Sequence, residues 1–200
     1  MAACGMQHRC VEAAVRRTHE HRFASERTGA EPGERLQGPA GGVLIAEVQA
    51  NDSALGISGW AQLTASGAVS GFEVFRWTTY GQEASVPLET RSPGSFLLVF
   101  DNMSGLTTGV ALSNTSATSV NVTQNIYDDS GTLLQTSAMN LAARSHSSYL
   151  LPSHDPATAN KRGMVEYVVP TGTQIALIGL RAKADGTLTT VPVLARSKVP

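Results

Sequence analysis

Short apolar stretches of alternating character, each closed by a turn containing glycine, recur through most of this sequence and constrain its fold more than any other feature. The clearest alternation lies within 120–127, where the apolar residues Val120, Val122 and Ile126 are separated by Asn121, Thr123 and Asn125. In a strand, successive side chains point to opposite faces, so this alternation predicts a strand with one buried and one solvent-exposed face.

The same alternation and β propensity predict a succession of short strands and leave no competing helical period after residue 42. Strands are expected near 43–49, 56–64, 69–77, 83–88, 95–100, 107–114, 119–127, 132–138, 145–151, 163–169, 174–182 and 187–194. Segments 96–100 and 175–180 are apolar on both faces, which is typical of central strands.

Three turns, at 65–67, 128–131 and 183–186, each end in glycine between an apolar strand and a Thr-rich strand. Glycine supplies the positive φ that closes a short hairpin loop, so neighbouring strands are expected to pair antiparallel. Pro87 and Pro192 each remove a ladder donor and belong at edges or strand ends. The fold class expected is all-β, an antiparallel β-sandwich of immunoglobulin-like or jelly-roll-like type.

The composition changes near residue 40. Residues 1–40 contain both Cys and three of the five His. A thin apolar stripe makes 11–27 a candidate helix, and 29–42, rich in Gly, Pro and Glu, reads as a linker. The domains expected are therefore a leader and linker at 1–40, poorly ordered or partly helical, and a β-sandwich domain at 41–200.

Charge and hydropathy exclude several kinds of partner. The formal net charge is −1 and only 16% of residues are charged, so no basic field would attract nucleic acid. No apolar run of about 18 residues exists, so no membrane span is expected. The first residues lack the uninterrupted apolar stretch of a secretory signal peptide, so the chain as given does not encode its own export.

A set of short motifs gives a resemblance to a known kind of module. They are 71–76 (GFEVFR), 83–87 (EASVP), 100–102 (FDN), 108–114 (TGVALSN), 144–150 (RSHSSYL), 161–163 (KRG), 179–181 (GLR) and 190–193 (TVPV). With them, the stretch from Gly71 to Val193 resembles uncharacterised β-sandwich modules of exported proteins in soil-type bacteria. The pattern of that family has Gly before His146, where Ser145 stands here. The resemblance implies a sandwich fold and an extracellular or cell-surface setting, and it transfers no activity, cofactor or functional site.

Candidate metal sites are weak. A Cys and His set in the leader has the right ligand chemistry for zinc, but its spacing matches no zinc motif; its members are Cys4, His8, Cys10, His19 and His21. The pairs Asp101–Asn102 and Asp128–Asp129 lack the spaced ligands of a calcium loop, and side chains bonding their own turn explain them more simply. We expect no metal and no cofactor.

Candidate catalytic residues are Ser153, His154, Asp155 and His146, the types that nucleophilic catalysis brings together. No Gly-x-Ser-x-Gly elbow occurs, and 151–156 reads as a loop fixed by two prolines. An enzyme would require Ser or Asp within hydrogen-bond reach of a histidine. We expect no catalytic site.

The densest aromatic patch comprises Trp60, Phe72, Phe75, Trp77 and Tyr80. Exposed rings can stack on sugars, whereas buried rings fill a core. Phe72 and Phe75 lie an odd number of residues apart and point to opposite faces of one strand, so only part of the set can share a platform. The candidate ligand-binding residues are Trp60, Trp77 and Tyr80, with Arg76 beside them.

Arg181 ends an otherwise apolar strand, and buried arginine is usually paired. We expect it to meet an acid, and the candidates are Asp101, Glu73 and Glu166.

The function expected from the sequence is a non-catalytic structural or adhesive β-sandwich module of a secreted or cell-surface bacterial protein. Its partner would be a polysaccharide or another surface protein. The alternative is a carbohydrate-binding module that uses the aromatic patch. A third hypothesis is an enzyme that uses His146 or His154. The sequence does not determine the oligomeric state.

Overall fold

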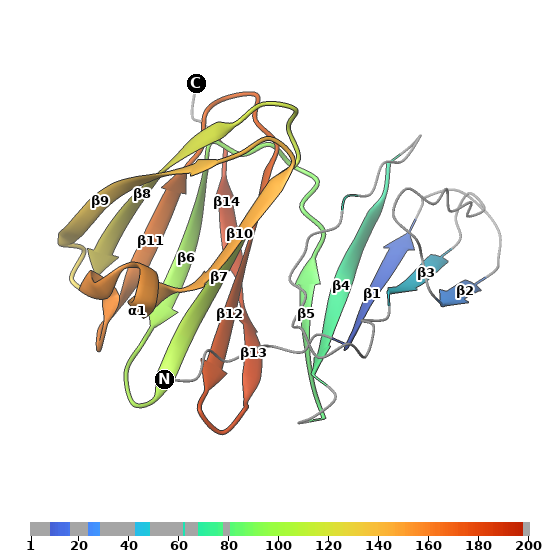
Figure 1. Cartoon of the computed structure of the whole chain (residues 1–200), viewed down its shortest axis with the longest axis horizontal. Coiled ribbons are helices and arrows are strands. Elements are labelled where there is room, and N and C mark those ends of the chain that lie inside the picture. Colours follow the sequence, from blue (N-terminus) through green and yellow to red (C-terminus); the bar gives the residue numbers. More distant parts are fainter. Residues whose placement is uncertain are drawn as a thin grey trace. The chain divides into compact units, whose positions relative to one another are not determined.

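The computed structural model describes residues 9–16, 24–28, 43–48, 62, 68–77 and 81–197, with side chains described at 62, 68–74 and 81–197. The chain divides into Met1–Thr90 and Arg91–Pro200, here named unit 1 and unit 2 (Figure 1). The division lies inside the segment 41–200 that the sequence assigns to one sandwich, and the division into leader and sandwich stays a prediction.

Unit 1 contains one five-stranded sheet of order β2-β3-β1-β4-β5. Its strands are β1 (Arg9–Arg16), β2 (Ala24–Thr28), β3 (Val43–Val48), β4 (Ser70–Trp77) and β5 (Gln82–Pro87). β2 pairs with β3 in parallel, and the other pairs are antiparallel. The helix considered for 11–27 is wrong for the described residues of that segment, because these residues extend and pair as strands.

Unit 2 consists of two antiparallel sheets joined by short connections (Figure 1). The five-stranded sheet has the order β14-β6-β11-β8-β9 and the four-stranded sheet the order β10-β7-β12-β13. The strands are β6 (Ser95–Asp101), β7 (Leu106–Asn114), β8 (Val120–Asp128), β9 (Leu133–Leu141), β10 (Ser145–Leu150), β11 (Arg162–Val168), β12 (Ile175–Lys183), β13 (Leu188–Val191) and β14 (Val193–Arg196). Two helical turns, α1 (Leu151–His154) and η2 (Pro156–Thr158), connect β10 to β11.

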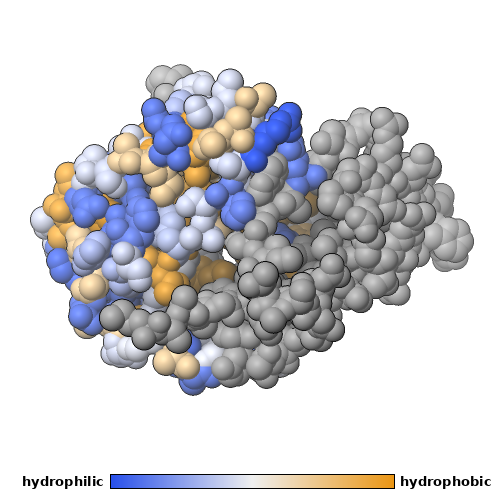
Figure 2. Space-filling model, viewed as in Figure 1, coloured by the Kyte–Doolittle hydropathy of each residue, from blue (hydrophilic) through white to orange (hydrophobic). Residues whose placement is uncertain are grey.

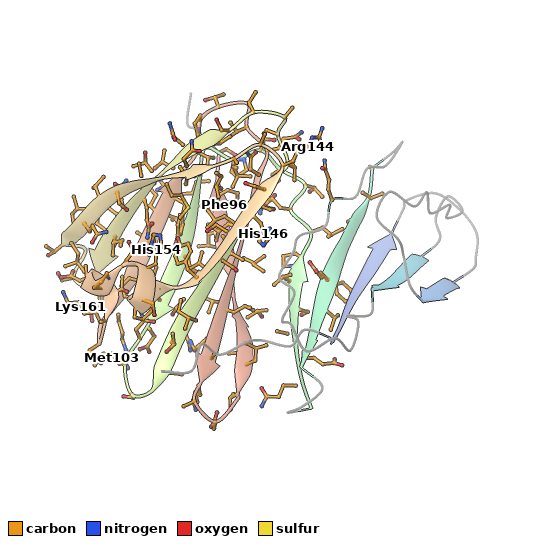
Figure 3. The ribbon with its side chains drawn as sticks, viewed as in Figure 1. Phe96, Met103, Arg144, His146, His154 and Lys161 are labelled. Atoms are coloured by element: carbon orange, nitrogen blue, oxygen red, sulfur yellow. The ribbon has the colours of Figure 1, made fainter. Side chains whose placement is uncertain are left out.

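The core of unit 2 lies between these sheets, which makes the unit a β-sandwich. Alternate residues point inward from both sheets, including Phe96 and Val165 from one and Leu112 and Leu177 from the other. Phe96, labelled in Figure 3, is fully buried between the layers. Burial of each large apolar side chain contributes about 1.5–3 kcal/mol. The expected all-β sandwich class is confirmed.

Most described strands fall where the period-two pattern predicts them. β6 and β12 are central strands, as their two apolar faces indicate. The predicted strand at 187–194 is two strands, because Pro192 interrupts it and the chain passes from the four-stranded sheet to the five-stranded one. Pro87 is the last residue of the edge strand β5, and the predicted strand at 56–64 lies largely outside the described residues.

The strand register gives unit 2 two distinct ends. Ser95 at the start of β6 lies opposite Arg196 at the end of β14, so the chain enters and leaves unit 2 at the same end, the proximal end. The connections at 102–105, 129–132, 151–161 and 184–187 lie at the other end, the distal end. In Figure 3, Met103, His154 and Lys161 mark the distal end, and Arg144 lies toward the proximal end.

The surface of unit 2 is mixed in character. Hydrophilic and hydrophobic residues are interspersed over the face shown in Figure 2. On the outer face of the five-stranded sheet, Val99, Leu133 and Leu194 are each more than half exposed. Within the described part of the chain, the structure contains no helix of the length and hydropathy that a membrane crossing requires.

Candidate functional site

A buried carboxylate, that of Asp155, lies at the distal end of the sandwich between α1 and η2. Prolines occupy the first turn of both helical segments, where a fixed φ favours the helical start. The backbone is then closed around Asp155: its N–H donates to the Leu151 carbonyl at 2.8 Å, and the Thr158 hydroxyl donates to the Asp155 carbonyl at 2.8 Å. These bonds turn the side chain inward, where it is 2% exposed.

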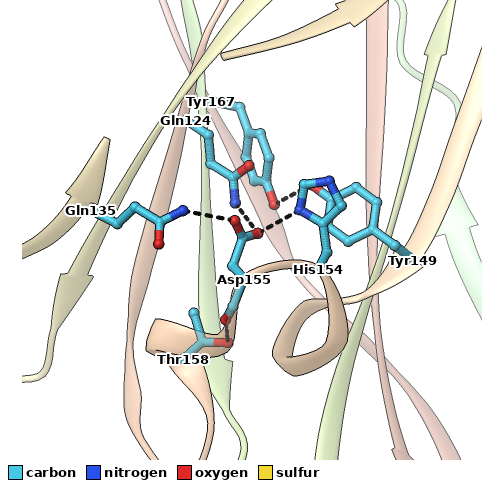
Figure 4. Close-up of polar contacts among 7 residues, drawn as sticks. All are labelled: Gln124, Gln135, Tyr149, His154, Asp155, Thr158 and Tyr167. Atoms are coloured by element: carbon cyan, nitrogen blue, oxygen red, sulfur yellow. Dashed lines mark hydrogen bonds and ion pairs between the residues drawn. The ribbon is translucent and has the colours of Figure 1, made fainter. Parts of the chain in front are cut away.

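Three side chains from three elements bind the Asp155 carboxylate (Figure 4). Gln124 of β8 donates from Nε2 to Oδ2 at 2.6 Å, and Gln135 of β9 donates from Nε2 to Oδ1 at 3.1 Å. His154 of α1 places Nδ1 2.9 Å from Oδ2. Because a carboxylate oxygen accepts, Nδ1 is the nitrogen that carries the proton in this contact. A buried carboxylate is tolerated only with such donors.

Two tyrosines complete the cluster, which we name the Asp155 network: Gln124, Gln135, Tyr149, His154, Asp155 and Tyr167. The hydroxyl groups of Tyr149 and Tyr167 lie 3.2 Å apart, and the His154 ring stacks on Tyr149 with centroids 4.1 Å apart. Burial, with a smaller contribution from the negative charge of Asp155, raises the pKa of Tyr149 to about 12, and the hydrogen bond with Tyr167 acts in the opposite direction. Burial likewise raises the pKa of Tyr167 well above its ordinary value. Both hydroxyls therefore keep their protons at neutral pH.

One acceptor in the network has no partner among the described residues. It is Oε1 of Gln124, whose side chain is 1% exposed. The amide is oriented by its other end, because Nε2 makes the short bond to Asp155. The free acceptor lowers the stability gained from the network, because a buried polar atom without a partner retains its desolvation cost.

An imidazole held at Nδ1 by a buried carboxylate meets one requirement of a catalytic base, since it leaves Nε2 for a second proton. The side chain of His154 is 41% exposed. Ser153, the neighbouring residue on α1, is exposed, and among the described residues no serine hydroxyl is bonded to the His154 ring. The site thus contains the aspartate and the histidine that the enzyme hypothesis requires. In the described part of the chain, no activated nucleophile accompanies them.

The second downstream histidine lies elsewhere. His146 is on β10, opposite Ser113 of β7. Figure 3 labels it apart from His154, on the other side of β10 from the network. The structure therefore brings only His154 together with Asp155, and the other two catalytic candidates are not part of the network.

The two oxygen-rich turns bond largely within themselves. Asp128 accepts bonds from the Ser130 N–H at 3.0 Å, the Ser130 hydroxyl at 2.6 Å and the Thr132 N–H at 2.9 Å. These bonds, the Ser130 hydroxyl first, lower the pKa of Asp128. Asp101 accepts from the Met103 N–H at 3.1 Å. The local backbone bonding expected for these turns is present.

Asn102 is buried and links the distal connections. Its Oδ1 accepts from the Thr108 N–H at 2.8 Å, and its Nδ2 donates to the Thr158 carbonyl at 3.2 Å.

Among the described residues, no group of three or more His, Cys, Asp or Glu side chains gathers in a way that would hold a metal ion.

The expected partners of Arg181 are wrong for two of the three acids. Asp101 pairs with Arg162 at 3.0 Å, and Glu166 lies 4.0 Å from Arg196. Glu73, the third candidate, belongs to β4 of unit 1, where burial raises the pKa of its carboxyl group. Nε of Arg181 is buried and has no partner among the described residues. Asp101 is thus paired with an arginine of the neighbouring strand β11, and Glu166 with an arginine of β14, on the far side of β6.

The side chains of the candidate sugar-stacking residues lie outside those that the structure describes. Trp60 and Tyr80 lie outside the described residues, and Arg76 and Trp77 are described only as backbone positions of β4. Arg76 lies opposite Glu83 and Trp77 opposite Gln82 of β5. The leader's Cys and His set also lies outside the described side chains.

Sequence reasoning missed Gln124 and Gln135, and it named Asp155 as a catalytic candidate while interpreting 151–156 as a loop. One signal was present: Gln124 occupies the inward face of its strand, between Val122 and Ile126. A polar residue at a core position implies a buried partner. The identity of that partner depended on how the connection between β10 and β11 folds back over the sheet.

Comparisons with protein families, curated proteins and solved structures find no match to this chain.

Proposed function

We propose that the chain is a non-catalytic adhesive module of a secreted or cell-surface bacterial protein, which contacts a polysaccharide or another surface protein through the distal end of unit 2. The observation that carries this proposal is the pairing of Ser95 with Arg196. A domain whose first and last strands meet at one end joins the rest of the chain at that end, so its distal connections lie at the opposite end of its strands from the points of attachment. A spacer in series would instead need its connections at opposite ends.

The bonding of Asp155 supports a structural rather than a catalytic role for the distal site. Both of its oxygens are occupied, by donors from β8, β9 and α1. A carboxylate so bound fixes the position of the connection that carries it. The Asp155 network then serves to hold the segment 151–161 in place at the end that makes contact.

The exported setting is supported by composition and by the resemblance of 71–193. Charged residues make up 16% of the chain, below the roughly 25% of soluble domains, and Ser, Thr and Asn replace them. Loops at one end of a sandwich are a common place for binding surfaces, because the sheets hold them rigidly.

Two matched charge reversals test the proposal. Lys161 is exposed at the distal end and Arg144 is exposed at the proximal end. Beads coated with the full chain, as wild type, Lys161→Glu or Arg144→Glu, are passed under flow over bacterial cell-wall polysaccharides and over surface-protein layers. Retention of the wild type is expected, with a clear loss in Lys161→Glu and none in Arg144→Glu.

Other outcomes contradict the proposal in distinct ways. Equal retention of both reversal variants would show that the distal end is not the contact surface. Absence of wild-type retention on every surface would exclude adhesion to these partners. Cleaved polysaccharide detected by mass spectrometry, and lost in His154→Phe, would favour the enzyme reading. Binding lost only in Trp77→Ala would favour the carbohydrate-binding alternative.

A further inference from the structure

The described strands of unit 2 include four edge strands, and three of them carry several features that discourage pairing with another chain. β13 and β14 have only four residues each and flank Pro192, and β14 carries Arg196. β10 lies between Arg144, whose φ is 49°, and the helical turn that contains Pro152. Short strands, charges, prolines and irregular backbone are the usual protections of a sheet edge.

β9, the remaining edge, carries one of these features, an extra residue at Leu134 where its register with β8 shifts, and it is regular from Gln135 to Leu141. It is nine residues long, LLQTSAMNL, and contains no charged residue, no proline and no glycine. In the described part of the chain it pairs with β8 alone. A long neutral edge strand presents a row of open backbone donors and acceptors to a further strand.

From Gln135 to Leu141, β9 is held in register on its inner neighbour, β8. On the outer face, the Asn140 side chain donates to Asn121 at 2.7 Å, and the Thr136 hydroxyl donates to Asn125 at 3.0 Å. On the inner face, Gln135 binds Asp155, and Met139 packs against the core. The strand is therefore presented ready-formed, which reduces the entropy lost when another strand adds to it.

We propose that β9 is an interface for a second copy of this chain, with the two β9 strands paired antiparallel about a twofold axis. Antiparallel pairing is self-complementary in its backbone groups, and a neutral strand can face its own copy without placing like charges opposite each other. The pairing would join two five-stranded sheets into one continuous sheet. Each unit 2 offers one such edge in its described strands, so the assembly closes at two copies.

Ala138 gives the sharpest test of this interface. Its side chain is exposed near the middle of β9 and lies opposite Thr123 of β8. In a twofold pairing centred on the middle of β9, the two Ala138 side chains are close neighbours. Lysine at this position brings two positive charges together, and glutamate brings two negative charges together.

The experiment is sedimentation velocity of the full chain over about a hundredfold range of concentration, because association depends on concentration. The wild type is expected to show a reversible monomer–dimer equilibrium. Ala138→Lys and Ala138→Glu are each expected to weaken dimerisation by about tenfold or more. An equimolar mixture of the two variants is expected to recover the dimer. Thr189→Lys, an exposed position on the edge strand β13, is the matched control and should dimerise like the wild type.

A wild type that stays monomeric at every concentration overturns the proposal, as does a dimer that tolerates both Ala138 variants or fails to re-form in the mixture. Hydrogen exchange gives a second measurement that needs no substitution. Amides on the outer edge of β9 should be protected in concentrated samples and lose that protection on dilution. Exchange independent of concentration would equally overturn the interface. The inference does not depend on the proposed adhesive function.

Discussion

Asp155 and Asp128 each accept three hydrogen bonds, yet the two carboxylates do different things. The donors of Asp155 come from β8, β9 and α1, and its side chain is buried. The donors of Asp128 belong to Ser130 and Thr132 of the same turn, and its carboxylate is open to solvent. The number of hydrogen bonds is equal, so the difference lies in what the bonds connect and in how much water competes with them.

The comparison teaches that sequence separation and burial determine the role of a carboxylate here. A buried charge that loses its partners leaves an uncompensated desolvation cost, whereas an exposed one is solvated again by water. We therefore expect substitutions in the Asp155 network to affect the whole sandwich, and substitutions at Asp128 to affect one hairpin turn.

Asp155→Ala is expected to have the largest effect. It leaves two glutamine amides and one imidazole without their acceptor, and should lower the free energy of unfolding by about 3 kcal/mol. Urea denaturation of the full chain, followed by far-UV circular dichroism, measures the change, with Asp128→Ala as the matched control. Equal effects of the two substitutions would contradict the distinction between the carboxylates.

The two glutamines sharpen the comparison within the network. Gln124 is buried and donates at 2.6 Å, whereas Gln135 is partly exposed and donates at 3.1 Å. Gln124→Met should lower the free energy of unfolding by about 2 kcal/mol and Gln135→Met by about 1 kcal/mol. The reverse order, measured by the same denaturation experiment, would show that burial does not set the strength of these bonds.

Alkaline pH should weaken the region around the network. The pKa of Tyr149 is raised from 10.0 to about 12, so the folded state holds this proton more tightly than the unfolded state. Its contribution to stability is fully present below pH 10 and is lost as the pH rises from 10 to about 12. Denaturation at stepped pH should show this fall in the wild type and a smaller fall in Tyr149→Phe. Identical pH profiles of the wild type and Tyr149→Phe would show that the burial of Tyr149 does not cause the loss of stability at alkaline pH.

Asp128→Ala is expected to have the smallest effect on the free energy of unfolding, and this effect should depend on pH in the acid range. The pKa of Asp128 is lowered in the folded state, so its contribution is present above the unfolded pKa and is lost as the pH falls through the folded pKa. The stability difference from wild type should therefore be small at neutral pH and vanish in strong acid. A difference that grows in acid would contradict the assigned hydrogen bonds.

The sequence predicted the sandwich from local features, because alternation and glycine turns act within a few residues. Gly131 and Gly186 do adopt the positive φ expected at their hairpins. The Asp155 network was not predicted as a unit, because its members are brought together by the register of β8 with β9 and by the return of the 151–158 segment over the sheet. The pattern of residues 120–127 marked Gln124 as inward, but no local rule paired it with an aspartate 31 residues away.

A double-mutant cycle between Asp155→Ala and Gln124→Met tests most directly whether the network ties the distal connection to the sheet. The account expects a coupling free energy of about 1.5 kcal/mol, since each substitution removes the partner of the other. Additive effects within error, with no coupling between the two positions, would contradict it.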